Sequence, residues 1–280
     1  MLFLPDPREE QVEHRRSENT LGWLTLVHKM LLSALGGAWP EQPITREYRR
    51  VLDVGCSSGY WLVRVAQSHP AIEKLYGVDQ HPRLIARART LAREQQVNER
   101  VEFHVMDALF MLEFPFDYLD LVSIQMGGCF LRTWEWLKLL QEFRRVARPE
   151  GIIRAVEHDF IGESSSPAFN RLMQLLMQTY YQAGHFFAPK HDGLLRELPR
   201  LFDQFGVRNV QTRSYQVELR ADTPDWQDFA RCIPPVMTPF VAKWGRLPED
   251  YEELCRQAMD EIARPDFAAI WKLLVVWGTK

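Results

Sequence analysis

The chain has 280 residues, with 34 basic and 37 acidic side chains and a formal net charge of −3. These charges are interspersed, so we expect no basic face for DNA or RNA. No segment reaches the ~20 apolar residues of a membrane span, and the N-terminus lacks the apolar stretch of a secretory signal. The four cysteines show neither close pairing nor metal-ligand spacing. Together these properties predict a cytoplasmic protein without a membrane, nucleic-acid or metal partner.

A first helix is predicted from Glu9 to Leu35, where apolar residues recur at helical spacing. Its apolar stripe includes one histidine, His28. The Gly36-Gly37 pair that follows is a typical C-terminal stop for such a helix.

Between residues 51 and 157, short apolar strands alternate with amphipathic helices, which is typical of a parallel sheet covered on both faces. This alternation then stops. The rest of the chain predicts a helix that starts at 164–167 and runs to about Ala183, and a second helix over 191–205. A strand over 207–219, a helical stretch with several prolines over 222–265 and a last strand over 272–280 follow. We therefore expect a helical cap over residues 1–48, a core over 49–160, and a lid with the last strands over 161–280.

The strongest local signal is a glycine-bearing turn after the apolar strand 51–54. Gly55 and Gly59 flank this turn, and an amphipathic helix follows it. Such a unit presents free backbone N–H groups and a helix N-terminus to a ligand. The next strand ends in Asp79, about twenty residues on, where a carboxylate is placed to accept both hydroxyls of a ribose. The pattern predicts a nucleoside-containing cofactor.

The segment from Asp53 to Gly59 resembles motif I of the class I S-adenosylmethionine-dependent methyltransferases, with Ser57 in place of the usual middle glycine. Further segments are similar to that family in order and spacing: Gly77–Gln80, Val101–Ala108, Leu119–Gln125 and Leu139–Gly151. The last segment, 272–280, is similar to the final strand of its small-molecule branch, which includes quinone-biosynthesis methyltransferases.

This resemblance implies a fold, a cofactor and a set of cofactor-binding residues. The fold is α/β, with a Rossmann-like, doubly wound and mostly parallel seven-stranded sheet, an N-terminal helix and a helical lid. The cofactor is S-adenosyl-L-methionine, released as S-adenosyl-L-homocysteine. The implied contacts are Gly55, Ser57 and Gly59 at the methionine end, Asp79 and Gln80 at the ribose, Asp107 and Ala108 at the adenine, and Gln125 near the methionine group.

An aromatic substrate pocket is expected where the lid covers the carboxyl ends of the strands. Its predicted lining includes Phe130, Tyr181, Phe186 and Trp226. We expect a small organic substrate, aromatic or apolar, bound by a monomer or homodimer. The candidate general bases are His158, at the end of the fifth strand, and His185. Catalysis by orientation alone and methylation at O, N or C all stay open.

The same turn allows three other interpretations. Gly55-Cys56-Ser57-Ser58-Gly59 also fits the nucleophile elbow of an α/β-hydrolase, but no preceding oxyanion segment is present and only one strand comes before it. An NAD-dependent oxidoreductase would share the ribose-binding acid yet needs Gly-x-Gly-x-x-Gly. A catalytically silent scaffold that binds S-adenosylmethionine is the third, and Ser57 is the departure that favours it.

Overall fold

A computed structural model describes residues 22–39, 48–189 and 193–280 of the chain. Residues 22–35 are helical (helix 22–35), and Gly36 follows with a φ of +78°. The part of the predicted first helix before residue 22 lies outside the described residues. The core then alternates as predicted: β1 (Arg50–Val54), α2 (Tyr60–Ser68), β2 (Lys74–Asp79), α3 (Pro82–Glu94), β3 (Val101–Val105), β4 (Leu119–Gln125), the 3₁₀ helix η1 (Gly127–Cys129), α4 (Glu135–Val146) and β5 (Ala147–His158).

The second half of the chain is less regular. Its elements are β6 (Glu163–Ser164), α5 (Pro167–Gln182), α6 (Leu198–Gln204), β7 (Arg208–Arg220), α7 (Trp226–Trp244), α8 (Tyr251–Ile262) and β8 (Ala268–Thr279). The helix predicted over 191–205 is shorter in the structure, because residues 193–197 form a turn; residues 191 and 192 lie outside the described part. Helix α7 continues through three prolines, which lack the N–H of a regular helical hydrogen bond. Burial of the apolar face of α7, which includes Ile233 and Met237, outweighs the cost of these missing hydrogen bonds.

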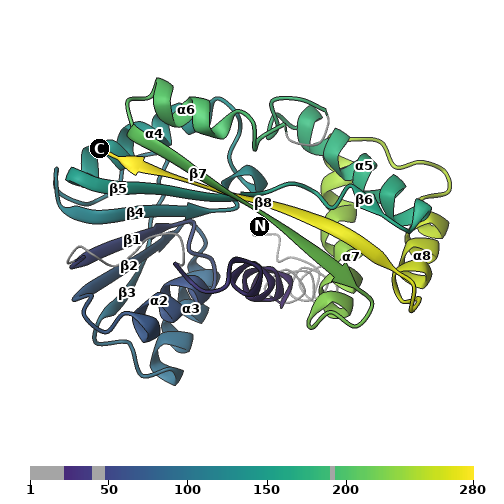
Figure 1. The fold of residues 1–280 in the computed structure, drawn as a ribbon, viewed down its shortest axis with the longest axis horizontal. Helices are drawn as coiled ribbons and strands as arrows, with labels where there is room; N and C mark the ends of the chain where they lie inside the picture. Colours follow the sequence, from purple (N-terminus) through teal and green to yellow (C-terminus); the bar gives the residue numbers. More distant parts are fainter. Residues whose placement is uncertain (1–21, 40–47, 190–192) are drawn as a thin grey trace, which may run out of the picture.

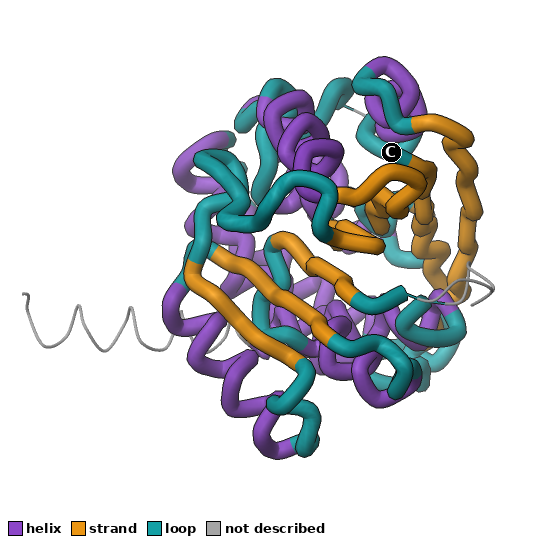
Figure 2. The backbone as a smooth tube through the Cα atoms, turned by 90° about the vertical axis from the view of Figure 1, so that its left-hand side faces the viewer, coloured by secondary structure: helices purple, strands orange, loops and turns teal. Residues whose placement is uncertain are grey.

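The strands form one sheet in the order β3-β2-β1-β4-β5-β8, with β7 on the far edge of β8. Strands β1 to β5 are parallel, and β8 runs antiparallel to both β5 and β7. These are the seven strands expected, and the two-residue β6 pairs with β8 as an eighth. Helices lie on both sides of the strands (Figure 2). Every residue of β4 is buried, as a central strand covered on both faces requires.

Figure 1 shows how the remaining helices are placed beside this sheet. The long strands β7 and β8 run from the sheet toward α5, α7 and α8, and helix 22–35 lies between that group and the core. The Trp23 ring stacks on Phe229 of α7 at a centroid distance of 5.9 Å. On the core side, Trp61 of α2 donates a hydrogen bond of 2.5 Å to the carbonyl of Ala38. Helix 22–35 therefore closes the space between the strand ends and α7.

Candidate active site

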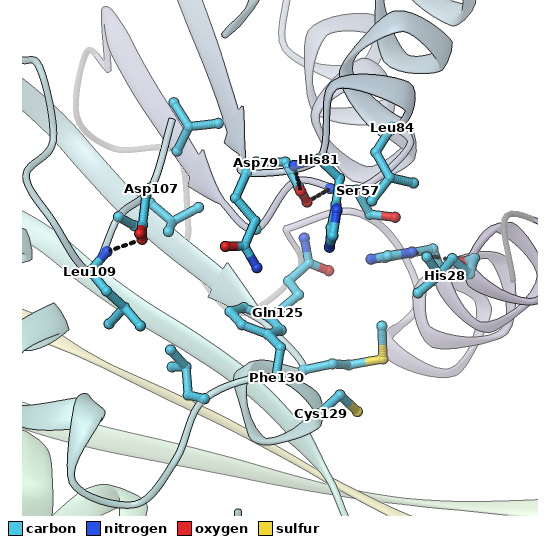
Figure 3. Close-up of a pocket in the computed structure, with 18 of the residues that line it drawn as sticks. His28, Ser57, Asp79, His81, Leu84, Asp107, Leu109, Gln125, Cys129 and Phe130 are labelled. Atoms are coloured by element: carbon cyan, nitrogen blue, oxygen red, sulfur yellow. Dashed lines mark hydrogen bonds between the residues drawn. The ribbon is translucent and has the colours of Figure 1, made fainter. Parts of the chain in front are cut away.

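A cavity of about 350 Å³ opens at the carboxyl ends of β1, β2 and β4, where the strand order reverses (Figure 3). One part of its wall, the sheet-edge half, consists of residues that end or follow strands: Gly55, Ser57, Asp79, Gln80, Asp107, Ala108 and Gln125. The other part, the helical half, comes from helix 22–35, α5 and α7: Trp23, Leu24, His28, Tyr180, Val236, Met237 and Phe240. Cys129 and Phe130, in and after η1, join the two halves.

The turn after β1 is held in place by backbone hydrogen bonds and by Asp79. The amides of Gly55 and Cys56 both donate to the carbonyl of Val78, at 2.9 and 3.0 Å. The Asp79 carboxylate accepts the amides of Ser57 and His81, at 3.1 and 2.9 Å. Each carboxylate oxygen has two lone pairs, so both retain an acceptor site for a ligand hydroxyl. Asp79 thus holds the turn and can still accept hydrogen bonds from a ligand.

Buried polar atoms without partners mark where a ligand belongs. The side-chain oxygen of Ser57 and both polar atoms of the Gln125 amide have no hydrogen-bond partner among the described residues, and both residues are buried. Buried polar groups are normally paired, so such atoms at a cavity wall point to a polar ligand. The amino and carboxylate groups of a methionine moiety fit this donor and acceptor set.

The far end of the sheet-edge half suits a flat ring. Asp107 accepts the amide of Leu109 at 2.8 Å, which fixes the loop after β3. Leu84, Met106, Ala108 and Leu109 present apolar groups to the cavity there. An adenine between these groups would have the exposed carboxylate of Asp107 at its polar edge. The residues present therefore fit a nucleoside joined to a methionine.

Comparison with known proteins agrees with this geometry. Residues 51–151 match a family described as a methyltransferase domain. Residues 51–151 therefore form a methyltransferase domain. The residues of the sheet-edge half fit S-adenosyl-L-methionine as its cofactor. No curated protein matches the sequence.

Solved structures share the fold of this methyltransferase. The YcgJ protein of Bacillus subtilis is 18% identical, with a TM-score of 0.52, and the match covers 91% of this chain and 98% of that one. A Bacillus halodurans protein described as a candidate methyltransferase is 14% identical, with a TM-score of 0.51 over 85% and 94%. The [4+2]-cyclase SpnF is 20% identical, with a TM-score of 0.50 over 90% and 92%. At these identities the likeness concerns the fold, which by itself does not determine the reaction.

Gly59 lies away from the cavity of the methyltransferase, although the resemblance implied a role at the methionine end. It is the N-cap of α2, with a φ of +75°. A Cβ at this position would come within 2.5 Å of the Phe103 ring and 2.9 Å of the Ala88 methyl group. Its place in the motif therefore reflects close packing of α2 against β3 and α3.

Neither predicted histidine lines the main cavity. His158 lines a separate recess of about 30 Å³, with Nε2 3.6 Å from the Cys129 sulfur and Nδ1 3.0 Å from the carbonyl of Asp159. His185 is buried, with Nδ1 2.8 Å from the carbonyl of Leu131. Burial lowers the pKa of both imidazoles. Both predictions placed a base at the sheet edge or lid, but the fold puts these rings behind the cavity wall.

The predicted aromatic lining is reproduced only in part. Phe130 lines the cavity, and its ring lies over Gly55, where an added Cβ would be 2.7 Å from Cζ. Tyr181 is 43% exposed and points away, because it lies about 100° around α5 from the lining residue Tyr180. Phe186 packs behind the wall, stacked on Tyr180.

Trp226 is the clearest difference between the predicted and the observed lining. It is fully buried and stacks on Phe267, with centroids 5.5 Å apart, in the core between α7 and the start of β8. Edge contact with Phe169 of α5 completes its surroundings. Its position at the N-terminus of α7 is about three to four helical turns from the lining residues of that helix, so it stabilises the packing of α7 instead.

His28 lines the cavity although the sequence predicted no role for it in the site. It lies on helix 22–35 and is 5% exposed. Its Nδ1 atom is 2.7 Å from the carbonyl of Leu24. The only sequence signal was a histidine within an otherwise apolar stripe, which more often marks a core position than a site.

Two buried carboxyl groups lie beneath the cavity. Burial raises the pKa of Asp53 to about 8, an effect that the nearby Gln125 amide and Arg154 guanidinium partly offset. Burial likewise raises the pKa of Glu157 to about 8, and its Oε2 accepts the amide of Gly128 at 3.2 Å. Glu157 thus supports η1, where the two halves of the wall meet.

Among the described residues, no three histidine, cysteine or acidic side chains come together in a way that could hold a metal ion. None of the described helices is both long and apolar enough to cross a membrane.

Proposed function

We propose that this methyltransferase methylates a small, largely apolar organic molecule bound in the helical half of the cavity. The observation that carries the proposal is the composition of that half. Among its described lining residues, which are mostly aromatic and aliphatic, only His28, the Tyr180 hydroxyl and the Trp23 indole N–H add nitrogen or oxygen atoms. An apolar pocket with few polar groups suits a compact organic substrate, aromatic or quinone-like, better than a peptide or nucleic acid.

The sheet-edge half would hold the cofactor through the residues already described. Asp79 would accept the ribose hydroxyls, Asp107 would meet the adenine, and Ser57 with Gln125 would meet the methionine end. The bound cofactor supplies a methyl group activated by the positive charge on its sulfur. The helical half would orient the acceptor toward that group and exclude water, which accounts for most of the rate enhancement that such a reaction needs.

The test is transfer of labelled methyl from S-adenosylmethionine to a panel of phenols, naphthols and quinols, with peptides and oligonucleotides alongside. Val236 is half-buried and lines the helical half, so Val236→Trp should fill that space. We expect Val236→Trp to abolish transfer to the small acceptors and to leave affinity for S-adenosylhomocysteine unchanged. Leu137→Trp, at an exposed position on α4, is the matched control. Cofactor binding without transfer to any acceptor would instead indicate the silent scaffold.

A further inference from the structure

The His28 ring is held in one orientation by its own helix. Figure 3 shows it projecting from helix 22–35 into the cavity, toward the side on which Ser57 and Gln125 lie. Its Nδ1 is 2.7 Å from the carbonyl of Leu24, and a carbonyl only accepts hydrogen bonds. Nδ1 therefore carries the proton, and in the neutral ring Nε2 has a free lone pair. Burial lowers the pKa of His28, so the neutral form prevails at pH 7.

Other titratable groups line the cavity, but each is engaged elsewhere or, as His81 does after β2, comes from the strand ends that build the sheet-edge half. They are Asp79, His81, Asp107, Cys129 and Tyr180. The Asp79 and Asp107 oxygens accept backbone amides. The Cys129 sulfur lies 3.6 Å from His158, and the Tyr180 hydroxyl faces the Met237 sulfur at 3.9 Å. Among the described lining residues of the helical half, His28 supplies the only nitrogen base.

The same half lacks a described carboxylate, which narrows the class of acceptor. A positively charged amine would find no acidic partner there, since both lining aspartates belong to the sheet-edge half. A neutral hydroxyl on an apolar ring needs only a hydrogen-bond acceptor. His28 Nε2 is such an acceptor, and an imidazole is a suitable base for a phenolic proton.

We propose that His28 is the general base of this enzyme and that its substrate class is an apolar molecule with a phenolic hydroxyl. This rests on the proposed function. The acceptor O–H bond breaks and its proton passes to Nε2. The oxygen forms a bond to the methyl carbon as the carbon–sulfur bond breaks, and that electron pair stays on sulfur. The imidazolium then releases the proton to water.

The first test is binding, with 4-nitrophenol and 2-naphthol compared with their methyl ethers on protein saturated with S-adenosylhomocysteine. We expect the wild type to bind each phenol about 10-fold more tightly than its ether, because only the phenol donates to Nε2. His28→Asn keeps a side-chain N–H for the Leu24 carbonyl but lacks Nε2. This variant should bring the ratio near 1 and leave affinity for S-adenosylhomocysteine unchanged. His104→Asn, at an exposed histidine on β3, should retain the wild-type ratio.

Two further readouts separate a base from a packing residue. In imidazole nitrogen NMR, the His28 ring should show a proton on Nδ1 and none on Nε2. In kinetics, His28→Asn should lower kcat for a phenolic acceptor about 100-fold and remove the acidic limb of the pH profile. A proton on Nε2, no binding of either phenol, or a phenol-to-ether ratio that His28→Asn leaves unchanged would overturn the proposal. Failure of S-adenosylhomocysteine itself to bind would instead overturn the proposed function on which it rests.

Discussion

The two halves of the cavity wall are built in different ways. The sheet-edge half comes from the ends of adjacent strands, and backbone hydrogen bonds to Val78 and the carboxylate of Asp79 fix its shape. The helical half brings together helix 22–35, α5 and α7, which are far apart in the sequence. Its contacts are mostly apolar side chains such as Trp23 and Phe229. The fold thus combines a sheet-edge half of fixed shape with a helical half whose lining can vary with little change to the sheet.

The largest effect is expected from Asp79→Asn in the sheet-edge half. An amide offers fewer acceptor sites than a carboxylate, so the ribose and the turn compete for one oxygen. We expect affinity for S-adenosylhomocysteine to fall about 100-fold, which corresponds to about 2.7 kcal/mol. Calorimetric titration measures this, with Asp260→Asn, at an exposed position on α8, as the control. Equal affinity of Asp79→Asn and wild type for S-adenosylhomocysteine would show that Asp79 does not bind the ribose.

Gly59→Ala tests whether this motif glycine acts through packing. An added methyl would collide with the Phe103 ring at a left-handed backbone position. We expect the free energy of unfolding to fall by about 2 kcal/mol. Chemical denaturation gives the value. Gly22→Ala, a helical glycine with open space around it, should have the opposite sign. An unchanged stability in Gly59→Ala would show that the α2–β3 contact can relax.

Glu157→Gln tests whether the carboxyl group that supports η1 is protonated in the folded protein, through the pH dependence of stability. The pKa of Glu157 is raised from 4.5 to about 8 on folding, so between these values the folded state keeps a proton that the unfolded state has released. Stability should therefore fall as pH rises from about 5 to 8, by up to about 1.4 kcal/mol per pH unit. Glu157→Gln should remove this contribution and leave the one from Asp53, whose pKa is raised likewise, whereas Glu99→Gln, at an exposed position, should leave the slope unchanged. Identical slopes in wild type and Glu157→Gln would mean that the carboxyl is ionised in the folded protein.

Ser57→Gly should have the smallest effect. Ser57 adopts a φ of +51°, which glycine tolerates better, and its hydroxyl is buried. Relief of that strain exceeds the added chain entropy of glycine by about 0.5 kcal/mol, so thermal denaturation should show a slight stabilisation. Affinity for S-adenosylhomocysteine should fall less than about 10-fold because the backbone amides remain. A larger loss of affinity would show that the Ser57 hydroxyl contributes strongly to cofactor binding.

The contrast between the halves also explains what the sequence could predict. The strand, turn and acid of the sheet-edge half are local in the chain, so residues 51–125 predicted β1 to β4 and most of the polar lining. Tyr181 was predicted where Tyr180 lines the wall, because helical phase near a cavity depends on tertiary packing. Trp226 and His28 show the same limit. Aromatic density gives no sign of which ring enters the core, and an apolar stripe gives no sign that one of its members faces a ligand.

The most direct test of a methyltransferase with a preformed cofactor site is titration calorimetry of the wild-type protein with S-adenosylhomocysteine and, separately, with NAD⁺. We predict micromolar binding of S-adenosylhomocysteine and at least about 100-fold weaker binding of NAD⁺, because the turn fits a methionine group and lacks the spacing for a pyrophosphate. No binding of S-adenosylhomocysteine, in protein shown to be free of carried-over ligand, would contradict this account.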